Sequence, residues 1–256
     1  MICFTMPGRT VDLNADMGEA RGDDAALVGL VTSANVACGF HAGDPMTMRA
    51  TVDAAVRAGV AVGAHPGYPD RQGFGRRDLA ATPAEITADV LYQIGALQAV
   101  CYAAGTRVRY VKPHGALYNR AAKDAGAAKA IAEAVRLADP SLVLLCLAGS
   151  HMVDVVKAAG VAVAEEAFAD RAYAADGSLV SRTVPGAVLT DPTVIAARAV
   201  RMVSEGTVEA HGGGTVPVRA DSLCVHGDTP GALEIVRAVR RALTDGGLTL
   251  APFAHA

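Results

Sequence analysis

The chain has 256 residues, of which 52% are hydrophobic, and its formal net charge is −3 at pH 7. This length suits one large α/β domain or two small ones, and because nothing resembles a linker we predict a single domain over residues 1–256. Aromatic residues are only 4% of the chain and no basic cluster occurs, which argues against nucleic acid and anionic membranes as partners.

Short apolar runs alternate along the chain with longer stretches of helical character. Three helix starts are well marked, because Asp44, Thr82 and Asp191 each precede a proline and offer a capping oxygen. Repeated strand–helix alternation implies parallel strands with right-handed crossovers. The predicted strands cover residues 11–16, 33–39, 60–65, 108–114, 141–148, 161–167 and 221–227, and the predicted helices cover residues 45–58, 83–104, 122–138, 150–159, 191–205 and 229–244.

Four of the seven histidines stand where an apolar run gives way to a loop: His41, His65, His114 and His226. The carboxyl ends of strands are where α/β folds assemble their sites. An open sheet usually concentrates its ligand at one switch point, whereas these residues end several strands. We therefore predict a closed or nearly closed barrel with roughly seven strands and a polar site at its mouth.

The first predicted strand has one polar and one apolar face. With a period of two, Asp12, Asn14 and Asp16 share a face, while Leu13 and Ala15 belong to the other. In a barrel the apolar face would meet the helices and the polar face would line the mouth. Buried carboxylates are costly unless they are hydrogen-bonded or functional, so Asp16 and Asn14 are site candidates, with inter-strand hydrogen bonding as the structural alternative.

The next two segments add polar side chains near strand ends. In the segment of residues 34–44, Asn35, His41 and Asp44 are candidates for substrate binding, although Asp44 also caps a helix. His65 opens a loop of Gly and Pro residues with several arginines, which could hold a carboxylate or phosphate or could be solvated. No G-x-x-x-x-G-K-[ST] sequence occurs, which excludes classical P-loop ATPase chemistry.

The segment VKPHGALYN at residues 111–119 is the sharpest functional signal. A lysine within a parallel strand is rarely there for packing. Lys112 and His114 share a face of the predicted strand, so they offer a cation and a titrating group side by side. We predict that both are catalytic. The structural alternative is that Lys112 only pairs with Asp12 or Asp16 inside the barrel.

The second half of the chain contributes three candidates for substrate binding, which are Glu165, Arg171 and His226. Of the adjacent Glu165 and Glu166, one at most can face the mouth, and parity favours Glu165. Arg171 lies near the start of a polar loop over residues 168–190, which has the length of a functional lid. His226 ends the last strand, before a helix that Asp228 or Thr229 would cap. Residues 207–219 are typical of a β-hairpin.

The cysteines and the N-terminal segment indicate the cellular compartment of the protein. Five cysteines form no CxxC pair, and Cys38, Cys146 and Cys224 lie inside apolar runs, as expected of reduced core thiols. No signal segment and no membrane-length apolar stretch is present. We expect a cytoplasmic protein.

Several long segments together resemble the LamB/YcsF family, which is identified with the A-subunit (PxpA type) of the bacterial 5-oxoprolinase complex. They are DLNADMGEA, SANVACGFHAGDP, GAHPGYPDRQGFGRR, VKPHGALYN, FADRAYAADGSLVSR and CVHGDTPGA, and they run in order from residue 12 to residue 232. Departures are small, such as Ala15 where cysteine is common, which argues against a thiol role there. The resemblance implies a (β/α)7 TIM-like barrel of the glycoside hydrolase/deacetylase type.

The resemblance also implies ATP-dependent opening of the lactam of 5-oxo-L-proline to L-glutamate, with two partner subunits of the PxpB and PxpC type. We expect ATP with Mg²⁺ as the cofactor. Asp16, His65 and His114 become candidates for proton transfer, and Lys112 for stabilising an anion.

Two other functions stay open. A metal-dependent deacetylase-like amidohydrolase would use an Asp–His–His set, but the chain lacks H-x-x-x-H. A substrate-binding subunit without catalysis of its own would also suit a polar mouth. We expect no tightly bound metal, although a divalent ion near His65 and His114 is compatible with the sequence.

Overall fold

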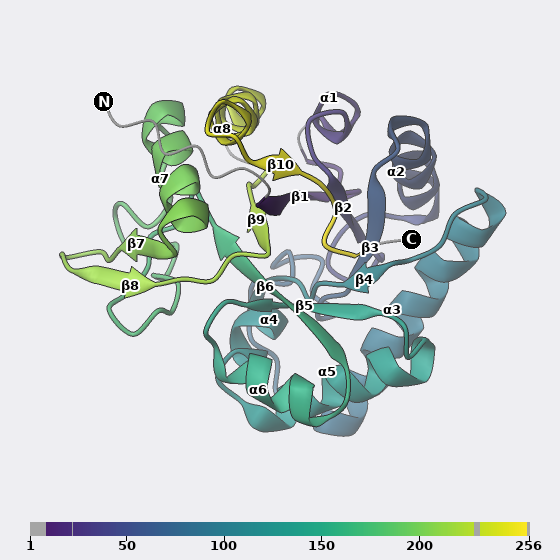
Figure 1. Ribbon diagram of the computed structural model, residues 1–256. Coiled ribbons are helices and arrows are strands. Elements are labelled where there is room, and N and C mark those ends of the chain that lie inside the picture. The colour runs from purple at the N-terminus through teal and green to yellow at the C-terminus, as the bar shows by residue number, and fades with distance from the viewer. Residues whose placement is uncertain (1–8, 22, 228–230, 255–256) are drawn as a thin grey trace.

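Seven parallel strands form a closed barrel in the computed structural model, which describes residues 9–21, 23–227 and 231–254 (Figure 1). Neighbouring strands pair in the order β1-β2-β3-β4-β5-β6-β9, and β9 pairs again with β1. The predicted seven-stranded β/α barrel is confirmed. Its strands are β1 (Thr10–Met17), β2 (Ser33–Ala37), β3 (Ala61–His65), β4 (Tyr110–Val111), β5 (Val143–Leu147), β6 (Ala162–Phe168) and β9 (Ser222–Cys224).

Helices surround the barrel, and the predicted helix starts are confirmed. The side chains of Asp44, Thr82 and Asp191 each accept a hydrogen bond from a backbone N–H of the first turn. The predicted cap at residues 228–229 lies outside the described residues. The helices are α1 (Asp24–Val28), α2 (Pro45–Ala58), α3 (Pro83–Ala103), α4 (Gly115–Ala121), α5 (Ala125–Ala138), α6 (His151–Ala158), α7 (Pro192–Ser204) and α8 (Ala232–Asp245).

Three short elements were not predicted as separate units. They are α1, the strand β10 (Thr249–Leu250), which pairs with the start of β1, and α4, which begins directly after His114. The predicted hairpin is confirmed: β7 (Thr207–Glu209) and β8 (Thr215–Pro217) are antiparallel. Within the described residues, no helix has the length and apolar character needed to cross a membrane.

The two faces of the barrel strands divide as the parity of β1 predicted. Leu13 and Ala15 are fully buried in the main apolar core, together with Val52 of α2 and Ile94 of α3. Asp12, Asn14 and Asp16 instead take part in side-chain hydrogen bonds inside the barrel. The hydrophobic layer therefore lies between strands and helices, and the interior is largely polar.

An apolar cluster closes the amino-terminal end of the barrel. Tyr110 is fully buried, and its ring contacts Phe253, which follows β10, at a centroid distance of 4.8 Å. A side chain at position 63 would collide with the Tyr110 ring, since a Cβ there would lie 2.2 Å from it. Gly63 thus makes room for Tyr110. Leu145, Ala164 and Ala254 complete this cluster.

The strand β4 is shorter than predicted, yet the chain keeps running beside β3 after it ends. The backbone N–H of Lys112 donates to the carbonyl of Ala64, and that of His114 donates to the carbonyl of Pro66. Pro113 between them has no N–H to donate. This irregular extension fixes the backbone of Lys112 and His114 at the carboxyl end of the barrel.

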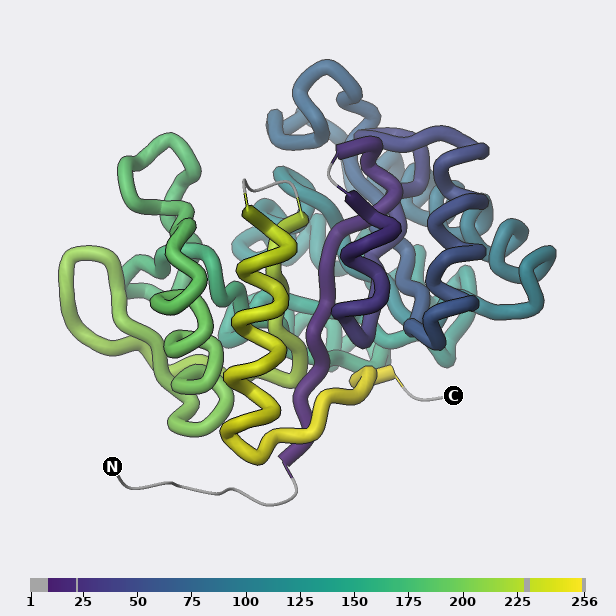
Figure 2. The backbone as a smooth tube through the Cα atoms, turned by 90° about the horizontal axis from the view of Figure 1, so that it is seen from above, coloured from purple at the N-terminus to yellow at the C-terminus, as the bar shows by residue number. Residues whose placement is uncertain are grey.

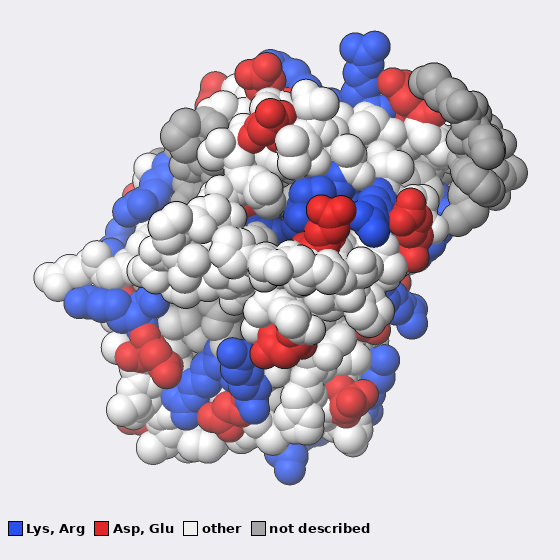
Figure 3. All heavy atoms as spheres, turned by 90° about the vertical axis from the view of Figure 1, so that its left-hand side faces the viewer, with Lys and Arg blue, Asp and Glu red and all other residues white. Residues whose placement is uncertain are grey.

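Loops after β3 and β6 project from the same edge of the molecule (Figure 2). This edge is the carboxyl end of the strands. The adjoining face, which carries α7 and the β7–β8 hairpin, shows acidic and basic side chains intermixed (Figure 3). Arg201 of α7, for example, pairs with Glu205 and Glu209 at 3.1 and 2.9 Å.

Candidate functional site

The four predicted catalytic residues converge at the carboxyl end of the barrel. Nζ of Lys112 lies 2.9 Å from Oδ1 of Asp16, and Nε2 of His65 lies 3.3 Å from Oδ2 of the same carboxylate. Nδ1 of His114 is 2.9 Å from Nε2 of His65. All four line one cavity of about 800 Å³. Their predicted proximity is confirmed, whereas their roles stay predictions.

Lys112 is buried between two carboxylates. Besides Asp16, its ammonium contacts Oε1 of Glu166 at 3.0 Å, and Oδ1 of Asn14 accepts from it at 3.3 Å. Burial is the largest single effect and opposes the charge, but Asp16, Cys224 and Glu166 together outweigh it and raise the lysine pKa well above its usual value. For Asp16, burial is likewise outweighed by His65 and Lys112, which hold its pKa well below the usual range. Both groups are therefore charged at neutral pH.

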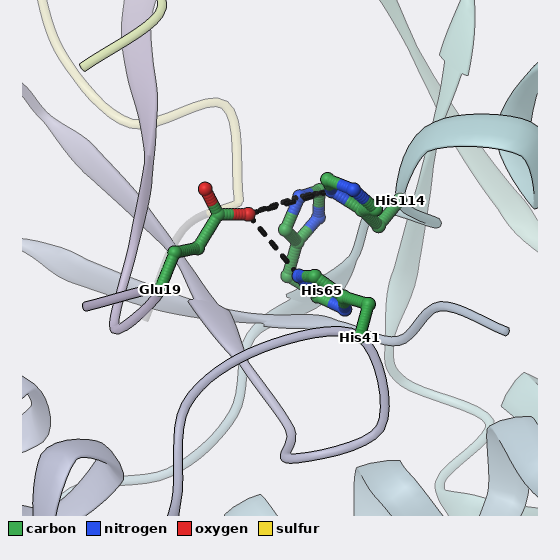
Figure 4. A group of neighbouring side chains, drawn as sticks. All are labelled: Glu19, His41, His65 and His114. Carbon is green, nitrogen blue, oxygen red and sulfur yellow. Dashed lines mark hydrogen bonds and ion pairs between the residues drawn. The ribbon is translucent and has the colours of Figure 1, made fainter. Parts of the chain in front are cut away.

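Three imidazoles gather around the carboxylate of Glu19 (Figure 4). The ring of His41 stacks on that of His114 at 3.8 Å, and its Nε2 lies 3.1 Å from Oε1 of Glu19. Burial, followed by the charge of neighbouring imidazoles, lowers the pKa of His41 and of His114 well below the usual value. Gly75 permits this packing, because a Cβ there would lie 2.8 Å from His41 and 2.9 Å from His114.

Glu19 is a site residue that sequence reasoning did not single out. It follows β1 by two residues, beyond the strand in which parity applies. Its signals were its place shortly after the first predicted strand and within the family-like segment that begins at Asp12, but it was not predicted as a site residue. Its side chain nevertheless reaches the cavity wall and joins the histidines of two other strand ends.

Below the cavity, a layer of amides, hydroxyls and carboxylates fills the barrel. Asn14 donates to Glu166 and to Ser222, and Asn35 donates to Asn14 and Asp16. The predicted substrate-binding residues Asn14 and Asn35 therefore hold the site's charged groups from beneath and are not among the residues that line the cavity.

Asp12 lies at the bottom of the same polar layer. It accepts hydrogen bonds from the hydroxyls of Thr32, Ser33 and Ser222. Burial dominates over these hydrogen bonds and raises the pKa of Asp12 to about 6. Asp12 and Asp16 were the two predicted partners of Lys112. Asp16 forms the ion pair, and Asp12 instead takes part in hydrogen bonds between strands.

The prediction that Glu165 faces the mouth is wrong, because Glu166 occupies that face. Glu166 is the register partner of Ser222, which in turn pairs with Asp12, so these three side chains point into the barrel. Tyr118 of α4 also donates to Glu166 at 2.8 Å. Glu165 points outward, where its carboxylate accepts from the backbone of Gly149.

The remaining predicted substrate-binding residues separate into two groups. His226 and Arg171 line the cavity. His226 is bonded to the buried Asp170 at 2.8 Å, and Arg171 donates to the backbone carbonyls of Val180 and Ala187. Asp44 is exposed and only caps α2.

The loop between β6 and α7 covers one side of the cavity. Its residues 178–183 form part of the same cavity wall as His65 and Lys112. Because the Arg171 guanidinium binds carbonyls within this loop, one buried side chain ties the loop's fold to the site. The position agrees with the lid predicted for residues 168–190.

Comparison with known proteins gives matches over nearly the whole chain. The model of the LamB/YcsF family matches residues 11–256. The 5-oxoprolinase A-subunit of Paracidovorax citrulli is 56% identical, over 95% of this chain and 99% of its own. A 5-oxoprolinase A-subunit of Pseudomonas syringae pv. tomato is 53% identical, over 96% and 98%. A crystal structure of the lactam utilization protein from Thermus thermophilus superposes with a TM-score of 0.90 and 51% identity, covering 96% of this chain and 100% of that one.

Proposed function

Because the chain belongs to the LamB/YcsF family, we propose that it is the A-subunit of a 5-oxoprolinase. The reaction opens the lactam of 5-oxo-L-proline to L-glutamate and is coupled to hydrolysis of ATP, with Mg²⁺, to ADP and phosphate. The names of the relatives support the role within a complex, and we propose two partner subunits, of the PxpB and PxpC type.

The observation that carries this proposal is the Lys112–Asp16–His65–His114 constellation in one cavity. It combines a permanent buried cation with a carboxylate and two imidazoles within hydrogen-bond reach of each other. Amide hydrolysis needs both kinds of group, because water must lose a proton while negative charge develops on the amide oxygen.

The reaction's energetics explain why ATP would be needed. A five-membered lactam closes readily, so hydrolysis alone is slow and reversible. Transfer of a phosphoryl group from ATP to the amide oxygen would activate the ring carbon toward water. Breaking the C–N bond of the adduct, with a proton going to the ring nitrogen, would open the ring and leave an acyl phosphate, whose hydrolysis releases glutamate and phosphate. In this scheme Lys112 stabilises the anion, and the Asp16–His65–His114 group takes the proton from water.

Reconstitution with omission tests the proposal. Glutamate release from 5-oxoproline should require ATP, this chain and both partner subunits. If glutamate appears when this chain is omitted, the chain does not have the role that we propose. If every subunit is needed but Lys112 and His114 variants of this chain keep full turnover, the chain binds substrate for a partner's active site.

A metal-dependent amide hydrolase is the second candidate. It is favoured by one observation: ligand atoms of Glu19, His41, His65 and His114 all lie within 4.8 Å of one another. Glutamate release without ATP, lost on chelation, would support this candidate over the ATP-dependent one.

A further inference from the structure

Two imidazoles and a carboxylate point at one spot on the cavity wall (Figure 4). Nε2 of His65 and Nδ1 of His114 are 2.9 Å apart, and Oε1 of Glu19 lies 3.8 Å from the first and 3.4 Å from the second. All three side chains are at least nine-tenths buried.

In each of these two rings, the nitrogen that points away from the other ring donates a hydrogen bond to a backbone carbonyl. Nδ1 of His65 lies 2.8 Å from the carbonyl oxygen of Lys112, and Nε2 of His114 lies 2.9 Å from that of Phe74. A carbonyl oxygen can only accept a hydrogen bond, so each of these nitrogens must carry a hydrogen. When both rings are neutral, Nε2 of His65 and Nδ1 of His114 therefore carry no hydrogen, and their lone pairs face each other. This contact is repulsive unless a cation lies between them.

The same arrangement is typical of histidines that bind metal. Their second nitrogen usually donates to a backbone carbonyl or a carboxylate, which fixes the tautomer and turns the lone pair toward the ion. The spacing also fits. With Zn–N bonds of about 2.0–2.1 Å, tetrahedral ligand atoms lie about 3.3 Å apart, and the three separations here run from 2.9 to 3.8 Å.

We propose that Glu19, His65 and His114 bind one divalent transition-metal ion, Zn²⁺ by ligand type. Two imidazoles and one carboxylate are a ligand set of catalytic zinc sites, which keep a further position open. Because all three residues line the cavity, that position would be directed toward it and could take a substrate oxygen. With the ion bound, Asp16 would remain as the proton-transferring group.

His41 supports this site as a positioning residue. Its Nε2 reaches Oε1 of Glu19 at 3.1 Å, and its ring is stacked on His114 with an angle of 4° between the planes. These contacts fix the carboxylate and one imidazole before any ion binds.

The proposal revises our expectation of no tightly bound metal, which relied on the missing H-x-x-x-H. Here the two histidines come from different strand ends. It does not depend on the lactam reaction.

A direct binding measurement tests the site in the full-length chain. After treatment with chelator, the protein should bind one Zn²⁺ per chain in equilibrium dialysis. Co²⁺ should give visible absorption bands from the same site, displaced by Zn²⁺. His65→Asn and His114→Asn should each weaken binding by about 100-fold or more, and His41→Asn by about 10-fold, as expected for ligands and for a residue behind them. His211→Asn, in the exposed hairpin turn, is the matched control and should bind like the wild type.

Two results would overturn the proposal. One is the absence of saturable Zn²⁺ and Co²⁺ binding to the wild-type chain, which would mean that a shared proton alone separates the two lone pairs. The other is unchanged binding in a folded His65→Asn or His114→Asn variant. If both variants fail to fold, Glu19→Gln takes their place, with circular dichroism as the check on folding.

Discussion

The barrel interior has two polar layers that differ in how their hydrogen-bond donors and acceptors are paired. In the lower layer around Asp12, Asn14 and Ser222, each hydrogen bond joins a donor to an acceptor, so the layer is complete by itself. In the upper layer, Nε2 of His65 and Nδ1 of His114 lie 2.9 Å apart, and with both rings neutral each of these nitrogens would be an acceptor. The lower layer holds strands in register, whereas the upper layer would be completed by the metal ion that we propose.

Lys112 belongs to both layers, and its removal should have the largest effect on stability. Lys112→Met would leave the carboxylate of Asp16 and the buried carboxylate of Glu166 without their cation. Breaking a buried ion pair in this way costs about 3–5 kcal/mol. Urea denaturation measures the loss, and Lys157→Met, at an exposed lysine of α6, is the control that should stay near the wild type.

A double variant separates the effect of Lys112 on stability from its effect on turnover. Lys112→Met combined with Glu166→Gln removes one carboxylate charge and should recover part of the stability. Turnover of the assembled enzyme should still be about 10²–10³-fold lower, the usual range for losing an electrostatic stabiliser. Normal turnover in the folded double variant would end the catalytic assignment of Lys112.

His114→Asn tests the upper layer alone. Asn can occupy the position before α4 as well as histidine does, so the fold should persist. Turnover should fall by about 10²-fold or more, which is within the range for losing a group that acts on the reacting atoms. His151→Asn, at the exposed start of α6, should leave turnover unchanged. Equal turnover in the two variants would show that the upper layer is not catalytic.

Asp12→Asn tests the lower layer through its pH dependence. The native pKa of Asp12 is raised from 3.8 to about 6, so the native state binds this proton more tightly than the unfolded state. The associated stability is present below about pH 4 and is lost as the pH rises through 6, by about 3 kcal/mol in total. Asp12→Asn should remove this loss, as measured by denaturation between pH 4 and pH 7. An unchanged slope in the variant would contradict the raised pKa.

Asp44→Ala should have the smallest effect and tests whether that residue belongs to either layer. As a helix cap it should contribute about 1 kcal/mol to stability and nothing to turnover. Asp191→Ala removes the equivalent cap of α7 and is its matched control. A loss of turnover confined to Asp44→Ala would restore the role in substrate binding that the sequence suggested.

The lower layer was easier to predict than the upper one, for a physical reason. Strand residues alternate strictly, so Asp12, Asn14 and Asp16 could be assigned to the interior from β1 alone. Alternation failed at Glu165 because small alanines flank the pair on both faces of β6, and nothing local shows which face is inside. Only the register with Ser222 decides it.

The upper layer depends on loops, where no periodicity operates. Glu19 lies in the loop after β1 and His41 in the loop after β2, and each is reached through a glycine with positive φ, Gly18 or Gly39. Their approach to His114 was therefore outside the reach of pattern analysis. The histidines at the predicted strand ends nevertheless indicated the correct end of the barrel, because parallel strands all end on the same side of the fold.

The apolar cluster around Tyr110 and Phe253 determines how molecules can move through this protein. It closes the amino-terminal end, and the polar layer fills the barrel above it, so the cavity lies at the carboxyl end of the strands, beside the β6–α7 loop. If the proposed function holds, lactam and amino acid would enter and leave this cavity from the same end of the barrel, so each product would have to leave before the next substrate enters. A partner subunit that delivers a phosphoryl group, as we propose, would have to dock at this end of the barrel, and its docking and release would then control both substrate entry and product release.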